Sequence, residues 1–459
     1  MDEADVAAGK VRIYAPSGFM EEAISENVMA GNAMSRRAQY MYGAFLARSA
    51  TGHVDAGTGK AASAGSITLI APTDLIDKAL DTRTIDGVQV EFQLAPETEA
   101  PAEMHLFFPQ FKVLCMAENA THSQHNILTP RGAQVRDAQK WSQQVDAARL
   151  HWGGQAEILI AQHTWPMWGG ERIDGFLADT RDMYAYLHDQ TVRLLNKGYT
   201  PTQISDAIPA LPPRLANKWH AREYYGTISY NVRAIYQRYL GFFDGNPANL
   251  DPLPPVETAR RTIAWMGGAD AVLARARESF ARGDYRWVAQ IVGQLVYAEP
   301  GNAPARRLQA DTLEQLGYQA ESAVWRNFYL TGAKELRDGI TQRAFTVASP
   351  DIVRAMTPEM IFDFMAVRVN AEKLGDEQAL INWRFADGQR YATTLRNRVL
   401  TVQPGREDPR ADATVSLPRA VLAGLAAGAL SLDQAVAEGK VRIEGQARKL
   451  ALLVSSLDS

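Results

Sequence analysis

The chain has 459 residues, too many for one compact core and enough for two to four domains. With 46% hydrophobic residues, 22% charged residues and a formal net charge of −4, its composition is typical of a globular protein and argues against a nucleic-acid binder that relies on a general basic field. The single cysteine, Cys115, excludes an intrachain disulfide and a zinc site built from cysteines.

The first region, residues 1–178, alternates strands and loops with some helix. The alternation indicates an α/β or α+β layered domain. Glu157–Ala161 is a short apolar run typical of a strand buried on both faces, and Pro109-Gln110 separates two strands as a hairpin turn would. The other expected elements are strands at Lys10–Tyr14, Ser66–Ile70, Val88–Leu94, Glu103–Phe108 and Phe111–Met116, and a helix at Ser17–Ser35.

The second region, residues 179–340, has helical periodicity. Apolar residues fall on one face of a helix that Gly198 is expected to end. Four further helices are predicted near residues 269–281, 285–297, 303–316 and 319–331. Their spacing is similar to tetratricopeptide-type hairpins, but two hairpins are too few for a solenoid, so they are interpreted as part of a helical domain.

The third region, residues 341–459, reads as a small α+β domain. Thr357–Val369 is an amphipathic helix with a threonine cap and a first-turn proline. Strands are expected at Ala379–Phe385, Tyr391–Leu395, Val399–Val402, Ala413–Ser416 and Val441–Glu444, and helices at Pro418–Ala426, Ser431–Ala437 and from Ala447.

The densest polar stretch is Met116–Arg131, which follows a predicted strand. It contains Glu118, His122, His125 and Asn126. A carboxylate just past a strand end, with imidazoles a few residues later, suits a metal or an acid–base site. The alternative is a polar turn that caps a helix beginning at Thr129-Pro130, and the spacing alone does not decide between them.

Two other segments fit a metal site. His163 follows the strand Glu157–Ala161, and strand ends are where open α/β sheets build sites. The segment Pro96–Met104 carries three glutamates, which are either surface charge or include a buried ligand. Zinc accepts histidine nitrogen and carboxylate oxygen together. No established short metal, phosphate-loop or nucleophile-elbow motif is present.

Long segments of the chain resemble the alkylsulfatases of the metallo-β-lactamase superfamily, which cleave dodecyl sulfate and related esters. The resemblance covers nearly the whole chain. The segments include YAPSGFMEEAISENVMAGNAMSRRAQYMYG (14–43), EAPAEM (99–104), AENATHSQHN (117–126), TPRGA (129–133), IAQHTWPMWGGERI (160–173), YQRYLGFFDGNPANLDPLPPVE (236–257) and a run over 285–337.

The resemblance implies an α+β multidomain fold in three parts. Residues 1–178 would be a truncated metallo-β-lactamase-like αββα catalytic domain, residues 179–340 an all-helical dimerisation domain, and residues 341–459 a C-terminal domain like sterol carrier protein 2 (SCP2). It implies a homodimer that hydrolyses alkyl sulfates to alcohol and sulfate with a zinc-activated water, and no nucleic acid or transmembrane segment.

The resemblance also implies the site residues. The family binds two zinc ions, for which Glu99, Glu118 and His163 would be ligands, while Asn126 and Arg131 would bind the sulfate and act in catalysis. His122 and His125 would have a supporting role only. The family's His-x-His-x-Asp-His motif would lie before Met1, so the chain is expected to hold too few ligands for two metals and to have little activity by itself, as a fragment or a degenerate relative.

Two other functions remain open from the sequence. One is a lipid or surfactant carrier, for which Met360, Phe364 and Ile381 would line an apolar tunnel unless they are ordinary core. The other is a catalytically dead dimeric scaffold that uses the helical region. No apolar run reaches the roughly 18 residues that span a membrane, and the acidic start is not a signal peptide, so a periplasmic, secreted or cytoplasmic location stays open.

Overall fold

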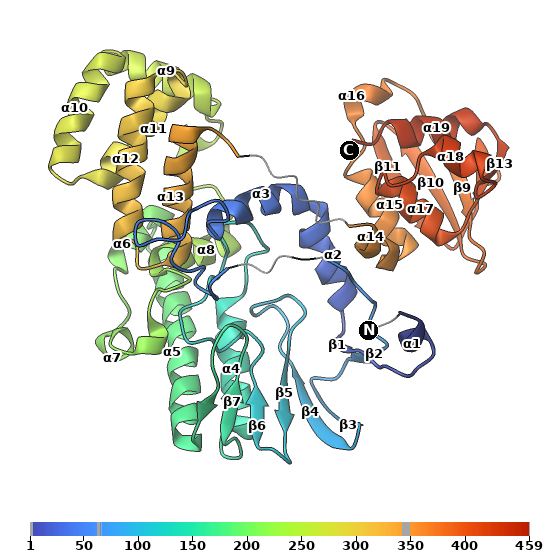
Figure 1. The fold of residues 1–459 in the computed structure, drawn as a ribbon, viewed down its shortest axis with the longest axis horizontal. Coiled ribbons are helices and arrows are strands. Elements are labelled where there is room, and N and C mark those ends of the chain that lie inside the picture. Colours follow the sequence, from blue (N-terminus) through green and yellow to red (C-terminus); the bar gives the residue numbers. More distant parts are fainter. Residues whose placement is uncertain (1–2, 62–64, 66, 342–348, 459) are drawn as a thin grey trace. The chain divides into compact units, whose positions relative to one another are not determined.

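The computed structural model describes residues 3–61, 65, 67–341 and 349–458. The chain divides into two compact units, which are described separately (Figure 1). One comprises Met34–Ser63 and Ile76–Ala344, and the other comprises Met1–Ala33, Ala64–Leu75 and Phe345–Ser459. The three predicted domain boundaries stay a prediction.

The larger unit contains a six-stranded sheet in the order β3-β4-β5-β6-β7-β8, of which β3 to β7 are labelled at the lower end of the view in Figure 1. Its strands are antiparallel to their neighbours except β6 and β7, which run parallel. Parallel neighbours end at the same edge of a sheet, which is where the candidate site lies. The strands are β3 (Leu80–Ile85), β4 (Val88–Leu94), β5 (Met104–Phe108), β6 (Val113–Cys115), β7 (Ile158–Ile160) and β8 (Met167–Trp168).

Two helices, α4 (Ala138–Trp152) and α5 (Gly170–Leu195), pack together and bury the apolar core of this sheet. Trp141 and Trp152 on α4 are fully buried, and the Trp152 ring stacks on Phe107 of β5 at 5.8 Å. Such large rings contribute most of the burial energy of a core. Within the described residues this unit has a single large sheet.

Helices form the rest of the larger unit. Helices α10 to α13 pack each on the next, as the predicted helical hairpins require, although the last helix spans Ala323–Asp338 and not residues 319–331. Asn302 and Ser322 cap α12 and α13 by accepting a backbone N–H with their side chains. The elements are α3 (Gly31–Met41, which begins in the other unit), α6 (Pro201–Ala207), α7 (Pro213–Ala216), η1 (Trp219–Ala221), α8 (Ile228–Leu240), η2 (Pro247–Asn249), α9 (Pro255–Trp265), α10 (Ala269–Ala281), α11 (Tyr285–Ala298), α12 (Ala303–Gln319) and α13 (Ala323–Asp338).

The smaller unit is built on a five-stranded sheet in the order β11-β10-β9-β12-β13. Its core includes Phe364 and Ile381, with Met360 partly buried against it, so these three residues belong to the packed core. The elements are α1 (Glu3–Ala7), β1 (Tyr14–Pro16), α2 (Phe19–Met29), β2 (Asp74–Ile76), α14 (Pro350–Ala355), α15 (Pro358–Ala366), α16 (Ala371–Leu374), β9 (Ala379–Arg384), β10 (Arg390–Arg396), β11 (Val399–Pro404), β12 (Ala413–Ser416), α17 (Arg419–Ala426), α18 (Leu432–Ala437), β13 (Arg442–Gly445) and α19 (Ala447–Ser455).

Four local predictions were wrong. The strand at Lys10–Tyr14 begins only at Tyr14, because its partner β2 is three residues long. The strand at Ser66–Ile70 is absent over residues 67–70, while Ser66 lies outside the described residues; the apolar Leu69 packs on the core instead. The helix Ser17–Ser35 is divided at Ala30. The helix after the Met116–Arg131 stretch starts at Ala138, because Asp137 caps it, and not at Thr129-Pro130.

Across the residues that the structure describes, every helix is too short or too polar to cross a membrane.

Candidate metal centre

Two predicted ligands lie together because of the parallel pairing of β6 and β7. Cys115 is the register partner of Ile160. Glu118 comes three residues after Cys115, and His163 comes three residues after Ile160. Their side chains meet past the strand ends, where His163 Nε2 lies 3.3 Å from Glu118 Oε2.

The backbone turns sharply just before or at each of these residues. Ala117 has φ 49° and His163 has φ 62°, the left-handed region that residues other than glycine seldom adopt. Backbone hydrogen bonds support the turns, because Met116 N donates to Ile160 O at 3.0 Å and Gln162 N donates to Ala117 O at 2.8 Å. Such strained conformations cluster at functional sites.

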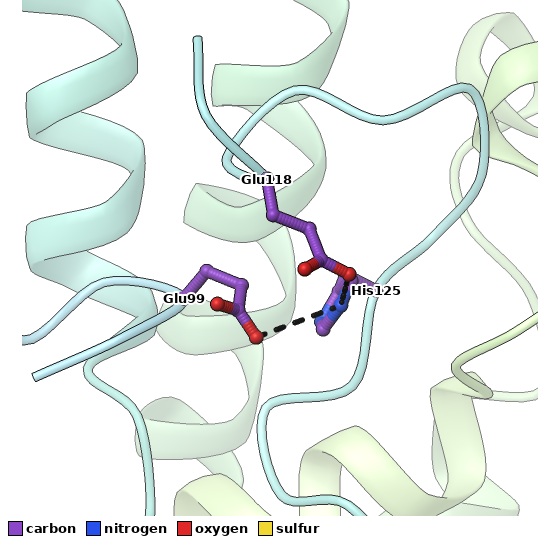
Figure 2. A group of neighbouring side chains, drawn as sticks. All are labelled: Glu99, Glu118 and His125. Carbon is purple, nitrogen blue, oxygen red and sulfur yellow. Dashed lines mark hydrogen bonds and ion pairs between the residues drawn. The ribbon is translucent and has the colours of Figure 1, made fainter. Parts of the chain in front are cut away.

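His125 and Glu99 complete the cluster (Figure 2). His125 Nε2 donates to Glu118 Oε1 at 2.9 Å and lies 3.8 Å from Glu99 Oε1. One donor atom from each of Glu99, Glu118 and His125 lies within 4.8 Å of the others. Glu99 reaches the cluster from the loop between β4 and β5, which Asn119 holds by accepting the Glu99 N–H at 3.0 Å.

The pKa values of two carboxyl groups at the cluster shift in opposite directions. Burial, together with the charge of Glu99, raises the pKa of Glu103 to about 8. Burial also raises the pKa of Glu118, but hydrogen bonds from His125 and His163 outweigh it and hold the pKa below its usual range. Glu118 is therefore a negative charge that a bound cation would face, whereas Glu103 keeps its proton near neutral pH.

The donor set fits a metal ion. Two carboxylates and one imidazole converge in Glu99, Glu118 and His125, and His163 adds a second imidazole on Glu118. Nitrogen and oxygen donors of this kind suit a borderline cation such as Zn²⁺. The described residues therefore hold a Glu/His cluster able to bind a metal.

A buried arginine joins the segments that carry the cluster. Arg136 forms an ion pair with Glu99 through Nη2, and its Nε donates to the Glu99 carbonyl. Its Nη1 donates to the carbonyl of Asn126 and lies 3.2 Å from His125 Nδ1. The sequence interpretation did not include Arg136, because its partners lie 10, 11 and 37 positions away.

The two predicted sulfate-binding residues are placed differently from each other. Asn126 is buried beside the cluster, and its Nδ2 has no hydrogen-bond partner within the described part of the chain. A buried amide donor without a partner is free to bind a ligand oxygen. Arg131 is half-buried, and its Nη1 donates to the adjacent Gly132 carbonyl at 3.1 Å.

The two histidines given a supporting role differ in position. His125 is in the cluster itself. His122 instead packs against Trp165, Phe176 and Trp219, with ring centroids 4.9–5.3 Å apart, and burial lowers its pKa to about 4. Both histidines lie in the stretch Met116–Arg131, so sequence density indicated the stretch but not which imidazole faces the carboxylates.

The mixed sheet, the Glu/His cluster at its edge and the attached helical region define an α+β multidomain protein with a candidate metal centre. A family model described as alkyl sulfatase dimerisation matches residues 200–339, and one described as alkyl sulfatase C-terminal matches residues 346–459.

Curated relatives match the whole chain. An (R)-specific secondary-alkylsulfatase of a Pseudomonas species is 49% identical, over 100% of this chain and 69% of the relative. The alkyl/aryl-sulfatase BDS1 of Saccharomyces cerevisiae is 50% identical, over 99% of this chain and 70% of the relative. A linear primary-alkylsulfatase of a Pseudomonas species is 48% identical, over 100% and 68%.

Solved structures agree. The stereoselective inverting sec-alkylsulfatase Pisa1 from a Pseudomonas species has a TM-score of 0.96 and 49% identity, covering 100% of this chain and 73% of that chain. A double mutant of Pisa1 has a TM-score of 0.97 at 50% identity with the same coverage. The chain belongs to the alkylsulfatase family. The predicted family, α+β multidomain fold class and hydrolase class are confirmed.

Proposed function

We propose that this protein hydrolyses alkyl sulfate esters to an alcohol and inorganic sulfate. The observation that carries the proposal is the candidate metal centre, in which Glu99, Glu118 and His125 converge and His163 contacts Glu118, in a chain that belongs to the alkylsulfatases. The relatives named as alkylsulfatases act on both secondary and linear primary esters, so the substrate class is the alkyl sulfate.

The metal of this proposal is zinc, and the family resemblance implies two ions. Glu99, Glu118 and His163 would hold it, and His125 adds a fourth donor that the sequence interpretation had not counted as a ligand. A bound zinc supplies a hydroxide near neutral pH and polarises the ester as a Lewis acid.

The protein's own residues bind and orient the sulfate group. The unpartnered amide of Asn126 can donate to a sulfate oxygen, where charge develops as the ester bond breaks. Arg131 can hold two sulfate oxygens with its planar guanidinium once it releases the Gly132 carbonyl. These remain proposed roles for both residues.

The same proposal includes a homodimer, because the helical region matches the dimerisation model over residues 200–339. No observation in the described residues favours a carrier function, since Phe364 and Ile381 are core residues.

The test is zinc content and ester hydrolysis by the purified chain. Zinc is measured by mass spectrometry, and sulfate release from decyl sulfate and from a secondary octyl sulfate is measured below their micellar concentrations. The sequence alone predicted little activity from three ligands. With His125 as a fourth donor, we now expect zinc binding and zinc-dependent release, both lost in Glu118→Gln. The control Glu157→Gln changes an exposed glutamate paired with Lys112 and should behave like the wild type. A chain that neither binds zinc nor releases sulfate contradicts the proposal.

A further inference from the structure

Arg136 lies where the two site segments come together. Its side chain is 9% exposed, and it precedes Asp137, the cap of α4. The backbone already connects both segments here, because Arg136 N donates to Ile127 O and Asp137 N donates to Glu97 O, each at 3.0 Å. The side chain therefore extends from a fixed position between the two segments.

Every nitrogen of the guanidinium is used on the site. Nε donates to the carbonyl of Glu99 and Nη2 donates to its carboxylate. Nη1 donates to the carbonyl of Asn126 and also lies 3.2 Å from His125 Nδ1. Only arginine offers donors in a rigid planar fork able to bind several acceptors at once, whereas lysine is a single point charge.

We infer that Arg136 is a positioning residue that fixes Glu99 relative to His125 and Asn126, so that the metal ligands and the sulfate-binding amide share one geometry. The inference rests on the proposed function. Arg136 touches neither substrate nor metal in this role. It acts through Glu99, His125 and Asn126, in the way that outer partners orient the ligands of metal sites.

The positive charge of Arg136 supports its role as a positioning residue. Arg136 is a buried cation that pairs with the carboxylate of Glu99, in a cluster that also contains the carboxylate of Glu118. Removing it leaves Glu99 without its ion-pair partner and free to move. Arg238 offers a comparison, because it contacts the same two segments through Glu97, Asp137 and the Val135 carbonyl but binds none of the four donor residues.

The experiment compares Arg136→Gln and Arg136→Lys with the matched control Arg238→Gln in the full chain. Zinc affinity is measured by competition with a chromogenic chelator, kcat and KM with decyl sulfate, and Tm without metal. We expect Arg136→Gln to weaken zinc binding about 10- to 100-fold. Arg136→Lys should recover part of the zinc affinity through its charge and keep a raised KM, because one ammonium cannot also hold the Asn126 carbonyl.

Arg238→Gln should keep the wild-type zinc affinity and KM even if its Tm falls. Wild-type zinc affinity in Arg136→Gln, or an equal loss in Arg136→Gln and Arg238→Gln, would overturn the inference. Failure of the proposed function is seen separately, in the wild type. If the wild-type chain binds zinc but releases no sulfate, the function fails while the comparison of zinc affinities still decides the role of Arg136.

Discussion

His105, on β5, is a fully buried imidazole whose Nε2 lies 2.7 Å from Asn119 Nδ2. Because the amide donates, Nε2 must accept and the ring is neutral. Burial lowers the pKa of His105 to about 3 from 6.5. The unfolded chain therefore takes up a proton below pH 6.5 that the folded chain takes up only near pH 3, so stability falls as the pH falls through this window.

We predict that His105→Gln flattens this pH dependence. The wild type should lose about 1.5 kcal/mol more of its unfolding free energy between pH 6.5 and pH 5 than the variant, since one pKa unit corresponds to about 1.4 kcal/mol. Urea unfolding at the two pH values measures the difference. Parallel losses in both proteins would mean that His105 does not carry the effect.

Asn231, on α8, is a buried residue that holds the loop of the candidate site. Its Nδ2 donates to Gln124 Oε1 at 3.0 Å and to His125 O at 2.8 Å, and its Oδ1 accepts from Ile127 N at 2.8 Å. We expect Asn231→Ala to lower the unfolding free energy by about 3 kcal/mol, because buried polar groups lose their partners.

Chemical denaturation measures that loss, with Asn249→Ala as the control. Asn249 is exposed and its side chain donates to Asp244 at 2.7 Å, so the change in unfolding free energy should stay within about 0.5 kcal/mol. Similar losses at the two positions would count against a special role for Asn231.

At the scale of elements, the start of α8 packs closely against the site loop at Gly226, the residue before Thr227, which caps α8. A Cβ at Gly226 would lie 2.3 Å from the His125 carbonyl oxygen and 2.9 Å from Asn126 N, which are backbone atoms and cannot turn aside. We predict that Gly226→Ala destabilises the fold by about 2 kcal/mol or more and lowers zinc affinity by displacing His125.

The comparison is Gly175→Ala, an exposed position within α5 with open space for a Cβ. It should be neutral or stabilise by up to about 1 kcal/mol, since alanine is the better helix former. Thermal unfolding and chelator competition on both variants provide the measurement. Wild-type stability and zinc affinity in Gly226→Ala would show that the loop can shift to accommodate the Cβ.

Elements with their own periodicity could be predicted from the sequence. β4 and β12 and the helices α10 and α11 agree with prediction to within a residue at each end. Elements that depend on tertiary partners could not be predicted in this way. The strand β3 alternates only weakly and was missed, and the helix α4 was missed as well. Glu118 and His163 could be predicted from strand ends, whereas the contacts of His125 and Arg136 depend on how loops fold back.

At the scale of the whole molecule, the region matched to the dimerisation model exposes large apolar side chains. Phe242 is 95% exposed and Trp265 is 92% exposed. We predict a dimer by light scattering of the eluted chain, and a shift toward monomer in the double variant Phe242→Ser, Trp265→Ser, because aromatic residues contribute much of an interface's energy.

Leu150→Ser is the control for this measurement. Leu150 is 73% exposed on α4, outside the matched region, so its loss should leave the measured mass unchanged. If the double variant stays dimeric at low protein concentration, other residues must form the interface.

The equal offsets of Glu118 and His163 from the paired residues Cys115 and Ile160 have a consequence for engineering. One inserted or deleted residue in either offset shifts its donor by about 3.3 Å, the rise per strand residue, while metal ligands tolerate about 0.2 Å. Libraries aimed at new ester specificity should therefore preserve segment length at both strand ends and vary only side chains that are neither donors nor hydrogen-bonded to them.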